Sequence, residues 1–119
     1  MSQIQITCAG SATFDVLAKA AGPLPIGVLG LVDTFSTAEG GPALRTGRVL
    51  AGMGIETRLI IPAGDDVFGR WLRESVPAPH LDVRFVASAK PTSTSLVAVD
   101  KDGERTMLHL SLIHISEPT

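Results

Sequence analysis

A glycine pair followed by an arginine is the part of this sequence whose residue types and spacing could do chemistry. Gly40 and Gly41 precede Pro42, and Arg45 lies four residues after Gly41. Glycine lets the backbone approach a ligand closely or adopt a positive φ, and proline suits the first position of a helix. The stretch therefore predicts a tight turn that opens a helix beside a small molecule, with Arg45 in the first helical turn.

Asp15 is the second residue to consider, in the stretch that follows the first expected strand. A carboxylate accepts two hydroxyl hydrogen bonds at once and so can hold a polyol. The alternative is that Asp15 caps its own loop backbone. Arg45 also has two interpretations: it is an ordinary solvated side chain, or it is a donor-only group that favours an anion over a hydroxyl.

The elements that must position these residues follow an α/β pattern. Residues 4–8 alternate between apolar and polar, and residues 57–62 and 81–86 are short apolar runs typical of strands in a parallel sheet. Helices are expected over residues 42–53 and 67–76, and Gly54 is expected to end the first of them.

Helical spacing predicts which side of each helix is buried. In the first helix it places Ala43, Thr46, Gly47, Leu50 and Met53 on one buried stripe. In the second helix Asp66 is expected to cap the N-terminus, and Trp71 is expected in the core. The pair Asp65 and Asp66 favours this cap over a metal site, because adjacent residues do not converge easily on one ion. We therefore assign no metal ligand, and the loop residue His80 is expected to be solvated.

Composition bounds the remaining possibilities. The chain has 119 residues, one cysteine and a formal net charge of −2, so it is about one domain long, cannot form an internal disulfide and lacks the basic surface of a nucleic-acid-binding protein. The N-terminus shows no signal peptide, and the most apolar window, residues 23–32, is too short to span a membrane. These features predict a cytoplasmic protein with no nucleic-acid or membrane partner.

The glycine spacing resembles the first signature of the pfkB, or ribokinase-like, carbohydrate kinases. Gly40, Gly41, Ala43, Gly54 and Gly64 are in register with that pattern. Two positions depart from it. Arg45 stands where the family has asparagine, and Gly47 stands where the family has alanine, serine or threonine.

The resemblance implies a fold and a domain division. The fold is a partial, truncated three-layer α/β sandwich of ribokinase type with a small β-sheet lid. Residues 1–109 would be the N-terminal part of the kinase domain. The lid strands are expected over residues 15–17, 27–34, 95–99 and 104–110, with an Asp-Gly hairpin turn at residues 100–103. Residues 110–119 depart from the family and match a translated sequencing adapter, so we interpret them as an artefactual tail.

The resemblance also implies a function. The parent would be an ATP-dependent kinase that phosphorylates a hydroxyl of a sugar, sugar derivative or nucleoside, using ATP and Mg²⁺. Asp15, Gly40, Gly41 and Arg45 would bind the substrate. The family's phosphate-binding loop and catalytic base lie in its C-terminal half, so no catalytic residue is assigned here and the chain alone is expected to be inactive. The alternative is a non-catalytic sugar-binding or regulatory relative, and a homodimer through the lid is expected because some family members associate in that way.

Overall fold

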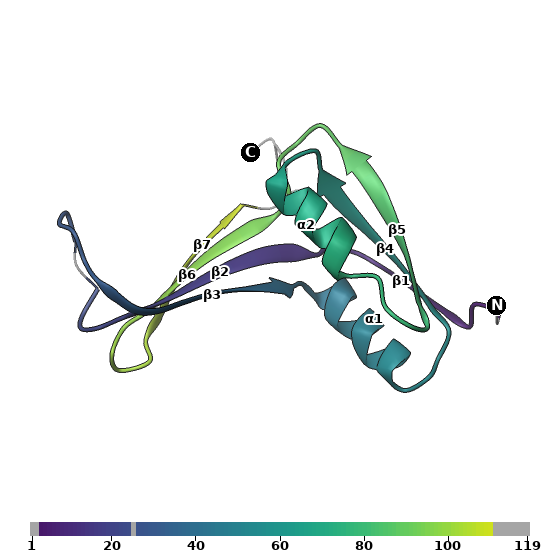
Figure 1. The fold of residues 1–119 in the computed structure, drawn as a ribbon, viewed down its shortest axis with the longest axis horizontal. Helices are drawn as coiled ribbons and strands as arrows, with labels where there is room; N and C mark the ends of the chain where they lie inside the picture. The colour runs from purple at the N-terminus through teal and green to yellow at the C-terminus, as the bar shows by residue number, and fades with distance from the viewer. Residues whose placement is uncertain (1–2, 25, 111–119) are drawn as a thin grey trace, which may run out of the picture.

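The structure is a computed structural model that describes residues 3–24 and 26–110 (Figure 1). In chain order its elements are β1 (Ile6–Ala9), β2 (Thr13–Ala20), β3 (Val32–Gly40), α1 (Pro42–Gly52), β4 (Thr57–Gly64), α2 (Val67–Ser75), β5 (Leu81–Ser88), β6 (Thr94–Val99) and β7 (Arg105–Leu110). Strands β1, β4 and β5 form a parallel sheet in the order β1-β4-β5. The other four strands form a second sheet, the lid, in the order β3-β2-β6-β7.

The parallel sheet confirms the prediction that residues 57–62 form a buried strand. β4 is the central strand, and Leu59 and Ile61 on it are fully buried. Both helices pack on the face that carries these two side chains (Figure 1). The chain moves across the sheet in one direction, from β1 to β4 to β5, and right-handed crossovers in one direction place both helices on the same face. The described residues of this sheet thus have one helical layer.

Helix α1 corrects the predicted stripe. Its buried residues are Ala43, Leu44, Gly47 and Ala51, whereas Met53 is 69% exposed. Leu44 and Ala51 lie seven positions apart, and so they mark the line of the helix that meets the core. The predicted stripe was rotated to one side of this line. The expected end of the helix is confirmed, because Gly54 has the left-handed φ of 83°.

Helix α2 confirms one prediction and corrects another. Asp66 caps the helix by accepting a hydrogen bond from the Gly69 amide. Trp71 does not lie in the core: it is 47% exposed and meets the Phe14 ring edge-on at 5.5 Å. The buried side of α2 carries Gly69 and Leu72, so Trp71 lies on its flank and covers the base of the lid.

The lid corrects two strand boundaries. The strand expected over residues 27–34 is β3, Val32–Gly40, and the strand expected over residues 15–17 is β2, Thr13–Ala20, which extends further at both ends. β2 and β3 pair antiparallel from Thr13↔Gly40 to Ala20↔Val32. Backbone hydrogen bonds to β2 therefore support a strand whose own sequence is polar and mostly exposed. Three apolar residues of the expected strand, Val28, Leu29 and Leu31, lie in the β2–β3 connection, where Leu29 is 91% exposed.

The β6–β7 connection is the predicted hairpin turn. Gly103 has a φ of 84°, and the Asp100 carboxylate accepts hydrogen bonds from the amides of Asp102 and Glu104. Leu110 pairs with Thr94 at the end of β7. Residues 111–119 of the interpreted tail lie outside the described residues.

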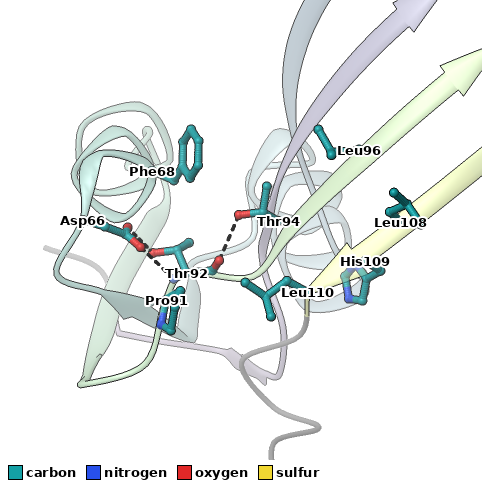
Figure 2. A pocket seen from close by; sticks show the side chains of 9 residues that line it. All are labelled: Asp66, Phe68, Pro91, Thr92, Thr94, Leu96, Leu108, His109 and Leu110. Carbon is teal, nitrogen blue, oxygen red and sulfur yellow. Dashed lines mark hydrogen bonds between the residues drawn. The ribbon is translucent and has the colours of Figure 1, made fainter. Parts of the chain in front are cut away.

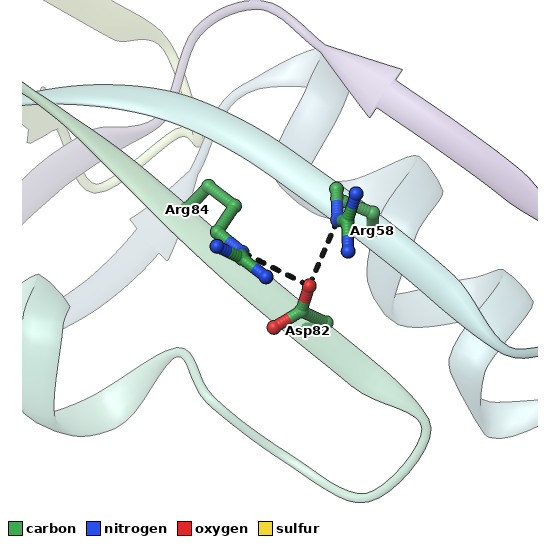
Figure 3. Close-up of polar contacts among 3 residues, drawn as sticks. All are labelled: Arg58, Asp82 and Arg84. Carbon is green, nitrogen blue, oxygen red and sulfur yellow. Dashed lines mark hydrogen bonds and ion pairs between the residues drawn. The ribbon is translucent and has the colours of Figure 1, made fainter. Parts of the chain in front are cut away.

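The sheet face opposite the helices carries a charged cluster (Figure 3). The Asp82 carboxylate accepts hydrogen bonds from Arg58 Nε at 2.8 Å and Arg84 Nε at 3.1 Å. The bond from Arg58 and, to a smaller extent, the bond from Arg84 hold the pKa of Asp82 below its ordinary value. Asp82 is thus fixed as a structural anion on β5. Within residues 3–24 and 26–110, no helix is long and apolar enough to cross a membrane.

Candidate substrate site

The glycine pair forms the junction between the lid strand β3 and helix α1. Gly41 has a φ of 103°, and a Cβ there would lie 2.5 Å from the Ser11 carbonyl oxygen. A Cβ at Gly40 would lie 2.5 Å from Asp15 Oδ2 and 2.9 Å from Thr13 Oγ1. Only glycine fits either position without displacing its neighbours. The predicted turn is confirmed, and Gly40 proves to be the residue against which the Asp15 carboxylate packs.

Asp15 is half-buried on β2, in register with Ala38 of β3. Its Oδ1 accepts a hydrogen bond from Thr13 Oγ1 at 2.8 Å. Among the described residues, Thr13 is the only one that donates to this carboxylate. Since an ionised carboxylate has about four acceptor positions, Asp15 keeps most of its accepting capacity for a ligand.

Arg45 lies one helical turn beyond the glycine pair and is exposed. Its backbone amide donates to the Gly41 carbonyl at 3.0 Å and so begins helix α1. Its guanidinium has no hydrogen bond or ion pair to any residue that the structure describes. The structure therefore brings Asp15 into contact with Gly40, whereas Gly41 meets Ser11 and Ala12. That Asp15 and Arg45 face one cleft stays a prediction.

A cavity of about 480 Å³ lies beside this turn, at the carboxyl end of β1 and the start of α1. Ligands of α/β proteins bind at this edge of a parallel sheet. The residues that line the cavity are mostly small: Cys8, Ala9, Gly10, Ser11, Pro42, Ala43 and Thr46. The sequence analysis did not predict that Thr46 lines this cavity, although Thr46 directly follows the candidate residue Arg45.

A second cavity, of about 410 Å³, lies between the start of α2 and the lid (Figure 2). Asp66 borders it but is not free to act as a base. Its Oδ1 accepts from Thr92 Oγ1 at 2.7 Å and its Oδ2 from the Thr92 amide at 2.9 Å. Burial raises the pKa of Asp66, but these bonds and the one from the Gly69 amide outweigh burial, so the pKa is lowered. Asp66 is a structural anion that ties α2 to the start of β6.

The other candidates for metal or acid–base chemistry do not assemble into a site. Asp65 is exposed, and the described residues include no group of three histidine, cysteine or acidic side chains that could hold a metal ion. His80, expected to be solvated, instead contacts the Glu56 carboxylate through Nδ1 and has a φ of 65°. This pair lies beside the amino ends of β4 and β5, away from the glycine turn.

One polar contact in the lid was missed altogether. Ser95 Oγ lies 2.6 Å from His109 Nδ1, between β6 and β7. The two residues are 14 positions apart in sequence, and only the hairpin register brings them together.

Comparison with known proteins matches this arrangement to one family. A family model described as "pfkB family carbohydrate kinase" matches residues 3–111. A search of curated protein sequences finds no significant match to the chain.

Several solved structures share the fold at low sequence identity. A carbohydrate kinase from Agrobacterium tumefaciens matches with a TM-score of 0.78 at 21% identity over 91% of this chain and 36% of its own. Ribokinase from Arabidopsis thaliana, in complex with ribose and ATP, matches with a TM-score of 0.78 at 23% identity over 92% and 36%. A nucleoside kinase from Methanocaldococcus jannaschii matches with a TM-score of 0.66 at 19% identity over 88% and 36%. The chain thus has a ribokinase-like fold and spans about 36% of the length of these structures.

Proposed function

Because this chain belongs to the pfkB family of carbohydrate kinases, we propose that it is the substrate-binding, N-terminal part of an ATP-dependent kinase. The longer protein would transfer a phosphoryl group to a hydroxyl of a sugar, sugar derivative or nucleoside. The observation that carries this proposal is the packing of the Asp15 carboxylate against Gly40, which leaves its oxygens available at the start of α1.

Each site residue has a distinct role in this proposal. Asp15 accepts hydrogen bonds from two hydroxyls of the substrate. Gly40 makes room for that carboxylate, and Gly41 turns the chain into α1, whose first turns line the cavity with Pro42, Ala43 and Thr46. Arg45 supplies donors where the family has an asparagine, so it favours a substrate with an anionic or carbonyl oxygen.

The transfer of the phosphoryl group requires parts beyond these residues. ATP and Mg²⁺ would bind to the part of the longer protein that corresponds to the family's C-terminal half, which also supplies the catalytic base. Residues 3–110 position one reactant only. Without donors for the charge that develops on the phosphoryl group, positioning alone does not give turnover.

The test is an ATP-consumption assay with a panel of sugars and nucleosides, on this chain and on the longer protein that carries it. We expect turnover by the longer protein with at least one substrate, and none by this chain. A much lower turnover in Asp15→Ala, with a raised KM for the sugar, would support the assigned role. Turnover by this chain itself would overturn the assignment, because it would place the catalytic residues among those described here.

The alternative function is a sugar-binding or regulatory relative that does not phosphorylate. Arg45 is the observation that favours it, because arginine cannot accept a hydrogen bond from a sugar hydroxyl as asparagine does. Tight sugar binding by the longer protein without ATP consumption would support this alternative.

The lid also suggests a homodimer. Leu96 and Leu108 are register partners on neighbouring strands and are 52% and 67% exposed. An apolar face of this kind is typical of an interface between subunits. Sedimentation of the longer protein should show a dimer that Leu108→Lys dissociates, and a monodisperse monomer at high concentration would contradict the proposal. We further propose a cytoplasmic location, with no nucleic-acid or membrane partner.

A further inference from the structure

Three aromatic rings meet where the lid joins helix α2. The chain has four phenylalanines, one tryptophan and no tyrosine, so this aromatic cluster of Phe14, Phe68 and Trp71 holds most of its rings. Phe14 on β2 stacks on Phe68 of α2, with ring centroids 4.6 Å apart and planes at 20°. Trp71 follows Phe68 by three positions, on the same side of the helix, and meets the Phe14 ring edge-on at 5.5 Å. The cluster therefore joins the first residues of β2 to a helix of the α/β layer.

Phe14 is the neighbour of Asp15 in the chain but projects from the other face of the lid. Consecutive side chains of a strand alternate between its two faces. The Phe14 ring is accordingly buried against α2, whereas the Asp15 carboxylate meets Thr13 and Gly40. The ring and the carboxylate share one stretch of backbone, so a movement of β2 that displaces the ring also displaces the carboxylate.

The position of the lid on the α/β layer decides where Asp15 lies relative to the cavity at the start of α1. Asp15 belongs to the lid, and its contacts with Thr13 and Gly40 are made within the paired strands β2 and β3, which move with it. The cavity of about 480 Å³ is lined by β1, the segment that follows it and α1. Contacts that cross from the lid to the α/β layer must therefore set the distance between the carboxylate and this cavity.

The aromatic cluster is one of three such contacts. Asp66 at the start of α2 accepts two hydrogen bonds from Thr92, just before β6. An ion pair joins Glu39 of β3 to Arg48 of α1 at 2.8 Å, but it is partly exposed and so contributes little. β2 and β6 are neighbouring strands, and α2 thus holds the lid at two points, one on each strand. The cluster is the point that lies next to Asp15.

We propose that Phe68 and Trp71 are positioning residues that act through Phe14 and hold Asp15 in place beside the cavity. A binding side chain must be kept within about 0.5 Å of its productive position, and the packing of its neighbours supplies that support. The cluster gives this support to a carboxylate whose own contacts lie within the lid. The inference rests on the proposed function, because it assumes that Asp15 binds the sugar.

The test replaces the partly exposed members of the cluster, because loss of the buried Phe14 ring would destabilise the fold itself. Phe68 is 36% exposed. In NMR titrations of the 119-residue chain with D-ribose, D-fructose and D-gluconate, Phe68→Ala should weaken binding of the tightest probe about tenfold, equivalent to the loss of one hydrogen bond. Trp71→Ala should weaken it in the same direction. Phe68→Tyr should retain the wild-type affinity, because it keeps the ring and its hydroxyl can reach solvent.

The matched control is Phe35→Ala on the lid strand β3. Phe35 is exposed, and its ring stacks on no other ring among the described residues. This substitution removes the same side chain from the lid and should leave the dissociation constant unchanged. An equal loss of affinity in Phe35→Ala would overturn the inference, because the effect would then not belong to the cluster.

Residual dipolar couplings of the backbone amides measure the positioning itself, since they report how the lid strands are oriented relative to the parallel sheet. In the wild type, one alignment tensor should fit β2 and β6 together with β4 and β5. In Phe68→Ala the lid should need a tensor of its own, and Phe68→Tyr should restore the single tensor.

The two measurements separate this inference from the proposed function. If Asp15→Asn abolishes binding while Phe68→Ala still fits one tensor or binds the sugar as tightly as the wild type, this inference alone is wrong. If the tensors change as expected but no probe binds the folded wild-type chain, the cluster positions the lid and the proposed function fails.

Discussion

Replacing Thr92 by valine should destabilise the chain, because Thr92 joins three elements through one buried hydroxyl. Thr92 is 1% exposed, and its Oγ1 donates to Asp66 Oδ1 at 2.7 Å while accepting from the Gly64 amide at 2.9 Å. Valine keeps the shape of the side chain and removes both bonds. A hydrogen bond to a charged group contributes about 1.5–3 kcal/mol, and a buried amide left without a partner costs about 1–3 kcal/mol. Both costs arise from the loss of the same hydroxyl and are not fully additive, so we expect a loss of about 3 kcal/mol in the free energy of unfolding.

Urea denaturation followed by circular dichroism would measure this loss. The matched control is Thr106→Val on the exposed strand β7, where the same substitution should change stability by less than about 0.5 kcal/mol. A double-mutant cycle with Asp66→Ala should give a coupling energy of about 1–3 kcal/mol, because the two side chains contact each other directly. A Thr92→Val variant as stable as the wild type would refute the reasoning, since it would mean that the Gly64 amide finds another partner.

Three further perturbations test the remaining features. Asp66→Asn should make the free energy of unfolding depend less on pH in acid, as urea midpoints between pH 2 and 6 would report. The lowered pKa of Asp66 gives stability that is fully present above the ordinary aspartate pKa of about 3.9 and is lost as the pH falls through the folded-state pKa. Gly40→Ala should displace the Asp15 carboxylate and weaken sugar binding at least tenfold by titration, whereas Gly52→Ala, with open space at its Cβ, should leave binding unchanged. Arg45→Asn in the longer protein should improve the affinity for a neutral sugar by about 1 kcal/mol in calorimetry, and an unchanged affinity would place Arg45 outside the site.

The sequence predicted the α/β layer well because its signals are local. The apolar runs of β4 and β5 and the cap at Asp66 each depend on a few consecutive residues, and the structure confirms all three. The helical stripes were less accurate. Trp71 was placed in the core by helical spacing, but the side of α2 that meets β4 is set by Leu72, and Trp71 instead covers Phe14.

The lid was harder to predict because its strands are defined by their partners. β3 has a polar sequence, and only its pairing with β2 identifies residues 36–40 as a strand. The same reason hid Ser95 and His109, whose contact depends on the register of β6 against β7. The glycine turn was predicted from residue type and spacing, whereas Asp15 was named because of the resemblance to the family, and the contact between Gly40 and Asp15 became visible only in the structure.

The order of the strands has a consequence for how the chain acquires its fold during synthesis. Phe14 on β2 pairs with Thr94 on β6, which is made 80 residues later, and β1 pairs with β4 across the whole lid hairpin. The β2–β3 hairpin can form early, but the other edge of β2 must wait without a partner until β6 has emerged. Contacts between such distant residues slow folding, and an unpaired strand edge promotes association with other chains during that interval. Temperature and chaperone supply should therefore affect the yield of this protein more than substitutions on its surface do.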